Sequence, residues 1–158
     1  MPEAIDVIDV LLRDHRVITG LAQQLDSVDD PLHVNRLYRR IVDELLAHEA
    51  AEHEVVFPAW ASAGAHDADP SLELRLGEHD ELNCMLREMA GLDPADFAFA
   101  KRASALLLEL EGHFEREEQT VFARLRVVVQ SEELIAMGER VRAVKRDARP
   151  TGGQVARQ

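Results

Sequence analysis

The sequence predicts an all-α protein: an antiparallel up-down-up-down four-helix bundle of two repeated helical hairpins, plus a short C-terminal helix. Apolar residues recur every three or four positions along most of the chain, which is the spacing of one helix face. Aromatic residues make up 4% of the sequence, and glycine and proline are few, so a β-rich fold is disfavoured. Short turn-forming segments separate the helical stretches, which is typical of antiparallel neighbours.

Each expected helix is bounded by turn-forming residues. The first ends before the turn at Asp29-Asp30-Pro31, and a loop of small residues over 62–70 follows the second. The third stops at Gly91, and the fourth is the longest. The fifth is shorter, and we expect it to cover one end of the bundle. The expected helices cover about residues 5–25, 31–61, 72–89, 95–128 and 134–146.

The chain has 158 residues, which is the length of one ordinary domain, and its 46% hydrophobic content can form a core. We assign the folded domain to residues 1–147. Residues 148–158 contain Pro150, Gly152 and Gly153 and carry no apolar face, so we predict that they form a disordered tail.

Composition and charge exclude several classes of protein. The net charge is −12, from 30 acidic and 18 basic residues, which disfavours binding to nucleic acid. No apolar run approaches the roughly 20 residues that a membrane span needs. The single cysteine, Cys84, excludes a disulfide framework and a Cys-rich zinc site. Together with the absence of a signal-peptide pattern, these features predict a cytoplasmic protein that is a monomer or a weak dimer.

Histidines occupy the apolar stripes of the long helices, where polar residues are not expected. Two of these helices add a glutamate one turn after the histidine, in the pairs His48–Glu52 and His113–Glu117. Side chains at positions i and i+4 share a helix face, so each pair can reach the same ion. The four histidines, one for each long helix, are His15, His48, His79 and His113.

An internal repeat relates these positions. The stretch from His48 aligns without gaps with the stretch from His113 at an offset of 65 residues, matching His, Glu, Val and Phe. The stretch around His15 aligns with the third helix at an offset of 64 residues, which pairs Asp14 with Glu78. Each hairpin therefore has a histidine on its first helix and His-x-x-x-Glu on its second, and we expect all four histidines at a similar depth in the bundle.

Four histidines and two glutamates on inward faces predict a site for two metal ions. An unsatisfied buried polar group costs about 1–3 kcal/mol, and a lone buried carboxylate costs more. Two cations would satisfy all six groups, since imidazole and carboxylate ligands suit iron, manganese or zinc. Bundles with carboxylates on facing helices are a known di-metal architecture. The opposing interpretation is a polar core that has lost its metal and is hydrated.

This ordered pattern, with the trailing Phe57-Pro58, resembles the hemerythrin family and specifically its HHE cation-binding branch. The resemblance covers about residues 6–128. It implies two non-haem iron ions with an oxo or hydroxo bridge, in which Glu52 and Glu117 are the bridging carboxylates and the histidines are terminal ligands. The implied metal ligands are His15, His48, Glu52, His79, His113 and Glu117.

The sequence departs from the oxygen-carrying hemerythrins in two respects. Those proteins have a second histidine on the third helix, where the flanking candidates here are Arg75 and Asn83. Their last carboxylate lies five positions after its histidine, which would be Glu118, so Glu118 stays an alternative to Glu117 as the bridge. Glu49 is a further candidate ligand, since some HHE domains use a carboxylate at that position.

Other polar residues lie close to the expected ligands in the sequence. Glu44 and Glu109 each come one turn before a ligand histidine, and they either hold the imidazoles or face water. His53 lies five residues after His48, which places it off the core face, and we expect it to be exposed to solvent.

With one histidine fewer than the carriers, the implied centre has more open coordination. This favours reaction with hydrogen peroxide or O₂, as in catalase- or peroxidase-like protection against oxidative stress, or the sensing of O₂, NO or redox state. Whether the chain turns over a substrate stays open at this stage. The alternative is an iron-binding or oxygen-carrying module without turnover, and a structural bundle filled with zinc is a third interpretation.

Overall fold

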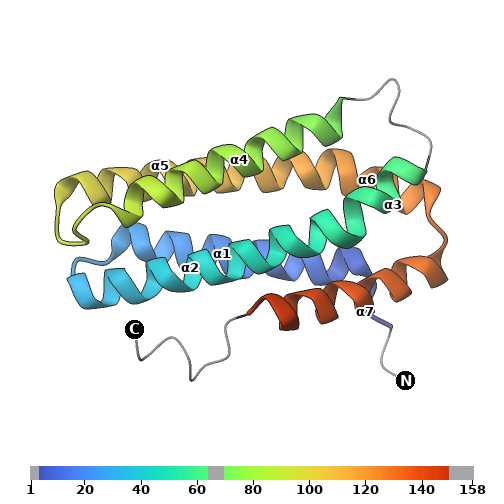
Figure 1. The fold of residues 1–158 in the computed structure, drawn as a ribbon, viewed down its shortest axis with the longest axis horizontal. Helices are drawn as coiled ribbons and strands as arrows, with labels where there is room; N and C mark the ends of the chain where they lie inside the picture. Colours follow the sequence, from blue (N-terminus) through green and yellow to red (C-terminus); the bar gives the residue numbers. More distant parts are fainter. Residues whose placement is uncertain (1–3, 64–69, 150–158) are drawn as a thin grey trace.

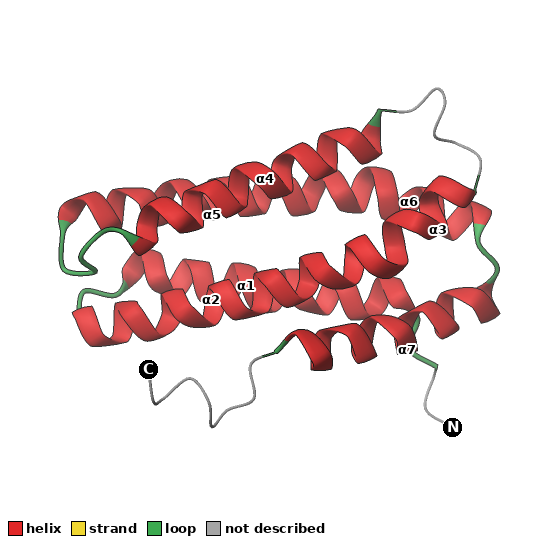
Figure 2. Cartoon of the chain, in the orientation of Figure 1, coloured by secondary structure: helices red, strands yellow, loops and turns green. Residues whose placement is uncertain are grey.

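The computed structural model describes residues 4–63 and 70–149, and all regular structure in these ranges is helical (Figure 2). Within them, four long helical stretches form an antiparallel bundle of two hairpins, with a further helix along one side (Figure 1). The predicted fold class is therefore confirmed. The elements are α1 (Val7–Ser27), α2 (Pro31–Ala51), η1 (Glu52–Val56), α3 (Phe57–Ser62), α4 (Ser71–Ala90), α5 (Phe97–Glu117), η2 (Glu118–Phe122), α6 (Ala123–Val128) and α7 (Ser131–Ala148).

Aspartates begin both helices of the first hairpin. The Asp6 side chain accepts a hydrogen bond from the Asp9 backbone N–H at 2.9 Å, and the Asp9 side chain accepts from the Asp6 N–H, which completes a capping box. The Asp30 carboxylate accepts from the His33 N–H at 2.9 Å, directly before Pro31 at the first turn of α2. Local sequence thus determines where these helices start.

The second helix of each hairpin contains a π-helical turn, and the two turns start within one residue of the same place in the repeat. In the first hairpin α2, η1 and α3 form one continuous helix, and the N–H of Phe57 bonds to the carbonyl of Glu52. In the second, η2 joins α5 to α6 and begins directly after Glu117. Pro58 follows the first π turn, whereas Ala123 occupies the equivalent position in the second. Proline is therefore not the common cause of the two π turns, which are frequently associated with functional sites.

Helix α7 packs lengthwise against α1 and α2, and does not cover one end of the bundle as the sequence led us to expect (Figure 1). Its residues Leu134, Met137 and Val141 are buried in the apolar core. Gly138 allows the close approach, because a Cβ atom there would lie 3.1 Å from the backbone of Asp6 and of Val7. The apolar face of α7 is therefore buried against other helices of the same chain.

Two separate apolar clusters fill the bundle, one towards each end. The first contains Ile18, Ile41 and Leu110, and the second contains Leu11 and Trp60, along with the buried side chains of α7. The polar stripe residues lie between these clusters. This arrangement surrounds a polar layer with apolar side chains on both sides, where unpaired polar groups are costly.

Two predictions from the sequence, the tail over 148–158 and the loop over 62–70, concern the ends of the described ranges. Ala148 is the last residue of α7, and Arg149 pairs with Glu44 at 2.9 Å, so the regular structure extends beyond residue 147. The rest of the predicted tail, 150–158, and most of the predicted loop, 64–69, lie outside the described residues. Among the described residues, no helix has the length and apolar character needed to cross a bilayer.

Candidate metal centre

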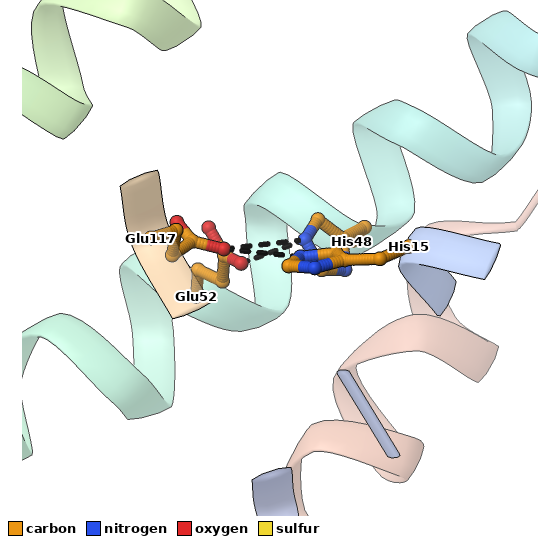
Figure 3. Close-up of side chains that lie close together, drawn as sticks. All are labelled: His15, His48, Glu52 and Glu117. Atoms are coloured by element: carbon orange, nitrogen blue, oxygen red, sulfur yellow. Dashed lines mark hydrogen bonds and ion pairs between the residues drawn. The ribbon is translucent and has the colours of Figure 1, made fainter. Parts of the chain in front are cut away.

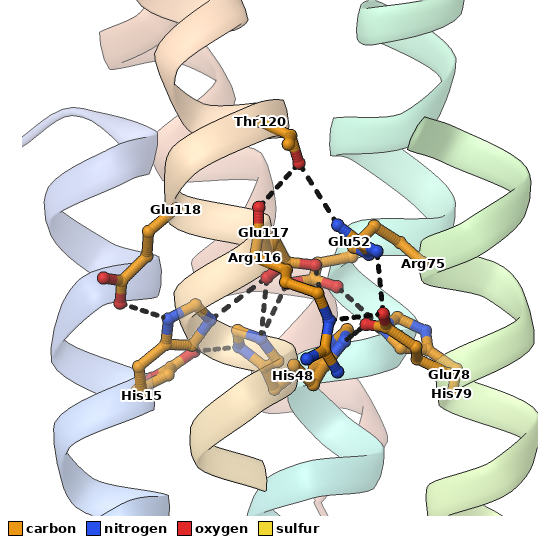
Figure 4. A network of polar contacts seen from close by, with 12 residues as sticks. His15, His48, Glu52, Arg75, Glu78, His79, Arg116, Glu117, Glu118 and Thr120 are labelled. Carbon is orange, nitrogen blue, oxygen red and sulfur yellow. Dashed lines mark hydrogen bonds and ion pairs between the residues drawn. The ribbon is translucent and has the colours of Figure 1, made fainter. Parts of the chain in front are cut away.

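Six predicted ligand side chains meet in the polar layer of the bundle (Figure 4). They come from α1, α2, η1, α4 and α5, so all four long helical stretches contribute. None is more than 3% exposed to solvent. The residues brought together are His15, His48, Glu52, His79, His113 and Glu117.

Four of these side chains form one group of potential metal donors (Figure 3). In this group, called here the four-donor cluster, one ligand atom from each of His15, His48, Glu52 and Glu117 lies within 4.8 Å of the others. The Nε2 atom of His48 is 2.6 Å from Oε1 of Glu52, and Nε2 of His15 is 3.1 Å from Oε1 of Glu117. Both carboxylates therefore point towards histidines of the first hairpin.

The second group, the three-donor cluster, consists of His79, His113 and Glu117, again within 4.8 Å of one another. Glu117 thus belongs to both clusters. Its Oε2 atom is 3.7 Å from Nε2 of His113, while Oε2 of Glu52 is 3.2 Å from Nε2 of His79. Each carboxylate therefore has one oxygen towards each hairpin, which is the placement that two bridging carboxylates need.

Several of these inward atoms have no hydrogen-bond partner although they are fully buried. They include both oxygens of Glu52, Oε2 of Glu117 and the Nε2 atoms of three of the histidines. Leaving a buried polar group unpaired costs about 1–3 kcal/mol for each group. The orphaned atoms converge on one layer and are nitrogen and carboxylate donors, so the chain's own residues fit two cations that accept imidazole and carboxylate ligands.

The two central carboxylates have opposite pKa shifts when no metal is bound. Burial opposes ionisation of Glu52, but His48, His79 and Glu117 together outweigh burial and hold the pKa of Glu52 well below its ordinary value. Burial and the negative charge of Glu52 raise the pKa of Glu117 well above its ordinary value. Binding of a cation would favour the ionised form of Glu117.

The histidines also divide into two electrostatic classes. Burial lowers the pKa of His15 to about 2 and that of His113 to about 4, because the charged imidazolium is poorly solvated there. Burial acts on His48 too, but Glu52 and Asp14 outweigh it and raise its pKa to about 10. Neutral imidazoles are the form that binds a metal.

Every one of the four histidines has a partner for its outer ring nitrogen, Nδ1. Such partners determine the tautomer and the orientation of a metal-binding imidazole. Asp14 lies 3.1 Å from Nδ1 of His48, and Glu118 lies 2.8 Å from Nδ1 of His15. The remaining two contacts join Glu78 to His113, and His53 to His79 at 2.9 Å.

The alternatives that the sequence left open occupy distinct places. Glu118 contacts the outer nitrogen of His15, so Glu117 and not Glu118 takes the central position. Glu49 is buried beside the site and accepts a hydrogen bond from Asn83 at 3.0 Å, but it belongs to neither cluster. Glu44 pairs with Arg149, and a further candidate, Glu109, is exposed to solvent. Neither of these two glutamates holds an imidazole.

Sequence reasoning missed the residues that do contact the outer nitrogens. Asp14 and Glu78 each immediately precede a ligand histidine, and each contacts the histidine on the second helix of its own hairpin. The alignment of Asp14 with Glu78 in the internal repeat was the sequence feature that could have predicted this role. His53 is exposed as expected, yet it reaches His79, a contact between segments that no local pattern could predict.

Comparison with known proteins agrees with this geometry. Residues 6–125 match the family described as the hemerythrin HHE cation binding domain. The chain belongs to the hemerythrin HHE family. This membership supports the assignment of the buried histidine and glutamate clusters to a cation-binding site.

Relatives and a solved structure show similarity over most of the chain. An uncharacterized hemerythrin-like protein of Schizosaccharomyces pombe is 24% identical over 138 residues, which cover 87% of this chain and 68% of that protein. A protein of Nostoc named DNA nickase is 28% identical over 138 residues, 87% of this chain but only 38% of that protein. The crystal structure of an HHE domain-containing protein from Mycobacterium kansasii superposes with a TM-score of 0.80 at 20% identity, over 91% of this chain and 87% of that one.

Proposed function

We propose that this chain binds two non-haem iron ions and reacts with small oxygen species, with hydrogen peroxide and O₂ as the favoured substrates. The observation that carries the proposal is the pair of buried donor clusters that share Glu117, in which several inward nitrogen and oxygen atoms form no hydrogen bond and face one another as close ion pairs. The six predicted ligands would hold the ions, Glu52 and Glu117 would bridge them, and an oxo or hydroxo group would complete the bridge.

A di-iron centre with open coordination positions supplies the redox chemistry for binding or reducing O₂, decomposing peroxide or binding NO. The protein's residues control geometry and access. Asp14, Glu78, Glu118 and His53 hold the outer nitrogens of the histidines, which keeps Nε2 of each imidazole directed inward. The apolar clusters on both sides limit access of bulk water.

A groove between α1 and α5 gives small molecules a path to the edge of the site. It has a volume of about 390 Å³, and its lining includes His15, Phe114 and Glu118. The ring of Phe114 stacks on that of His15 at 3.9 Å between centroids, so the imidazole forms part of the groove wall. The groove has room for a molecule as small as peroxide, O₂ or NO beside His15, which favours reaction with such a molecule over a role as a closed structural site.

The second candidate function is iron binding or oxygen carriage without turnover. It is favoured by the deep burial of all six donors, which suits retention of a metal or a reversible ligand. The name of the Nostoc relative does not change the proposal, because the match covers 38% of that protein and a net charge of −12 opposes binding of a polyanion. We also propose a cytoplasmic location, since the reducing cytoplasm suits a chain with a single cysteine.

Anaerobic loading with ferrous iron tests this proposal. We expect about two irons per chain, followed by a visible charge-transfer band when O₂ is admitted, and turnover of added peroxide by the loaded protein. A band that reverses when O₂ is removed, without peroxide turnover, would favour the carrier. The exposed His33 offers a matched control, since His33→Ala should bind iron like the unmodified chain. Failure to bind iron would contradict both candidates.

A further inference from the structure

Arg75 is a buried cation beside the proposed metal centre. It lies on α4 one turn before His79, on the same helix face, and is 4% exposed. Among the arginine and lysine residues that the structure describes, Arg75 alone is buried. A buried positive charge is costly unless it is paired, so its surroundings indicate what it serves.

The guanidinium group uses only part of its hydrogen-bonding capacity (Figure 4). Its Nη2 donates to Oε1 of Glu78 at 2.7 Å, and its Nη1 donates to the hydroxyl oxygen of Thr120 at 3.4 Å. Its Nε is fully buried and has no partner. An arginine side chain offers five N–H donors, so donor capacity is left over inside the protein.

The charge of Arg75 is only partly compensated. Glu78 also accepts from Nε of Arg116 at 2.8 Å and contacts Nδ1 of His113, so one carboxylate serves two guanidinium groups and an imidazole. Thr120 carries no charge. On the other side of the site, Asp14 contacts a single lysine, Lys145. The surplus of positive charge therefore lies next to the three-donor cluster.

The three-donor cluster is the half of the site that Arg75 adjoins. Arg75 is connected to this cluster in two ways. It lies one turn before His79 on α4, and it pairs with Glu78, which contacts His113. The three-donor half thus adjoins a buried group that attracts negative charge.

We propose that Arg75 is a positioning residue that makes the three-donor half of the centre prefer small monoanions over neutral ligands. The class includes azide and the deprotonated form of hydrogen peroxide. This inference rests on the proposed function, because the anion would bind at the metal-loaded site. A buried charge that is only partly compensated acts over several ångströms through the protein interior, so one arginine can set such a preference.

Titration of the oxidised, iron-loaded protein with azide, followed by its absorption band, tests this inference. We expect Arg75→Met to weaken azide binding by about tenfold or more, with NO binding changed less than about twofold. Arg116→Met is the matched control, because Arg116 contacts the same carboxylate but is 46% exposed, and it should retain the azide affinity. Arg75→Lys retains the charge and should recover part of the affinity. Equal azide affinities for Arg75→Met and Arg116→Met would overturn the inference.

A second pair of variants covers the case in which Arg75→Met does not fold or hold iron. Thr120 is partly exposed and contacts Arg75, so Thr120→Glu places a neutralising charge beside the guanidinium, and Thr120→Gln does not. We expect azide to bind more weakly to the Glu variant, and equal binding would contradict the proposal. Iron content is measured on every sample. Absence of iron from the unmodified chain contradicts the proposed function itself, whereas changed azide affinity at two irons per chain reports on Arg75 alone.

Discussion

The two hairpins carry the same repeat but surround their histidines differently. In the first, the Asp14 carboxylate that contacts His48 also contacts Lys145, which belongs to α7. In the second, the equivalent Glu78 contacts His113 together with Arg75 and Arg116, all within the hairpin. Helix α7 makes most of its contacts with the first hairpin, through α1 and α2.

The difference teaches that a duplicated sequence pattern does not guarantee two equivalent metal sites. The first hairpin's histidines form one close cluster with both carboxylates, whereas those of the second form a close cluster with Glu117 and reach Glu52 through His79, at 3.2 Å. The cationic partner comes from a distant helix in one half and from neighbouring turns in the other. Asymmetry therefore arises from packing, and it makes the donors of the first half more closely spaced than those of the second.

Removal of the shared carboxylate should have the largest effect. Glu117 belongs to both clusters, so Glu117→Gln removes a charged donor from each, and we expect binding of both irons to be lost. Measurement of iron per chain after gel filtration checks this. Glu118→Gln is the matched control, because Glu118 contacts only the outer nitrogen of His15. Loss of both irons in the Glu118 variant alone would reverse the assignment of the bridging carboxylate.

Removal of one histidine from each half should break the symmetry of the repeat. His113→Ala removes a donor from the half in which the glutamates lie 3.2 and 3.7 Å from the histidines, and His15→Ala from the half in which they lie 2.6 and 3.1 Å away. We therefore expect His113→Ala to retain about one iron per chain under conditions in which His15→Ala retains more. Equilibrium dialysis against limiting ferrous iron measures both variants side by side. Identical binding curves would mean that the two halves are equivalent despite their different donor spacing.

Removal of the charge from Asp14 or Glu78, two of the three carboxylates that contact outer ring nitrogens, should have an intermediate effect on iron affinity. Asp14→Asn and Glu78→Gln retain the shape but lose the charge opposite His48 and His113, and we expect iron affinity to fall by about 10- to 100-fold in each. Competition with a chelator of known affinity measures the change. The Glu44→Gln variant serves as control, since Glu44 contacts Arg149 and no ligand histidine. A similar loss in that control would remove the special role of Asp14 and Glu78.

Acid should destabilise the metal-free chain through the two histidines with lowered pKa values. His15 and His113 have folded-state pKa values of about 2 and about 4, below the ordinary value of 6.5. Below pH 6.5 the unfolded chain therefore binds more protons than the folded one at these positions, and their contribution to stability is lost as the pH falls. Thermal unfolding of the chelated protein between pH 4 and pH 7 should show a shallower decline in His15→Gln than in the unmodified chain. An unchanged slope would contradict this origin.

His48 should act in the opposite direction on the alkaline side. Its folded-state pKa of about 10 lies above the ordinary value, so the stability it contributes is complete below pH 6.5 and is lost as the pH rises towards 10. Asp14→Asn removes one cause of the raised pKa, and we expect a smaller alkaline loss of stability in this variant. The same thermal unfolding series, extended to pH 10, makes the comparison.

The smallest effect is expected for the partner of His79. His53 is exposed and contacts Nδ1 of His79 at 2.9 Å, so His53→Ala lets water take its place. We expect iron affinity to fall by less than about tenfold, below the range for buried carboxylate partners. Chelator competition, with the exposed His33→Ala as reference, resolves the difference. A loss as large as that of Glu78→Gln would show that the exposed partner holds its histidine as firmly as the buried one.

Periodicity and turn residues were sufficient to predict the bundle. Apolar spacing located each long helix, and Pro31 and Gly91 lie at the boundaries that the structure shows. These features are local, because helix formation and capping depend on residues a few positions apart. The side on which α7 packs is not local: it depends on the close approach that Gly138 permits to the start of α1. Sequence spacing carries no information about that contact.

By itself, the sequence determined the helices, the repeat and the inward direction of the six candidate ligands, since the positions i and i+4 of a helix share a face whatever the helix packs against. Only the tertiary structure decided that Glu117 lies at the centre while Glu118 contacts His15, that Asp14 and Glu78 hold histidines on other helices, and that Arg75 is buried beside the site. The physical reason is that these contacts join side chains far apart in the chain. Their geometry depends on how the two hairpins and α7 pack.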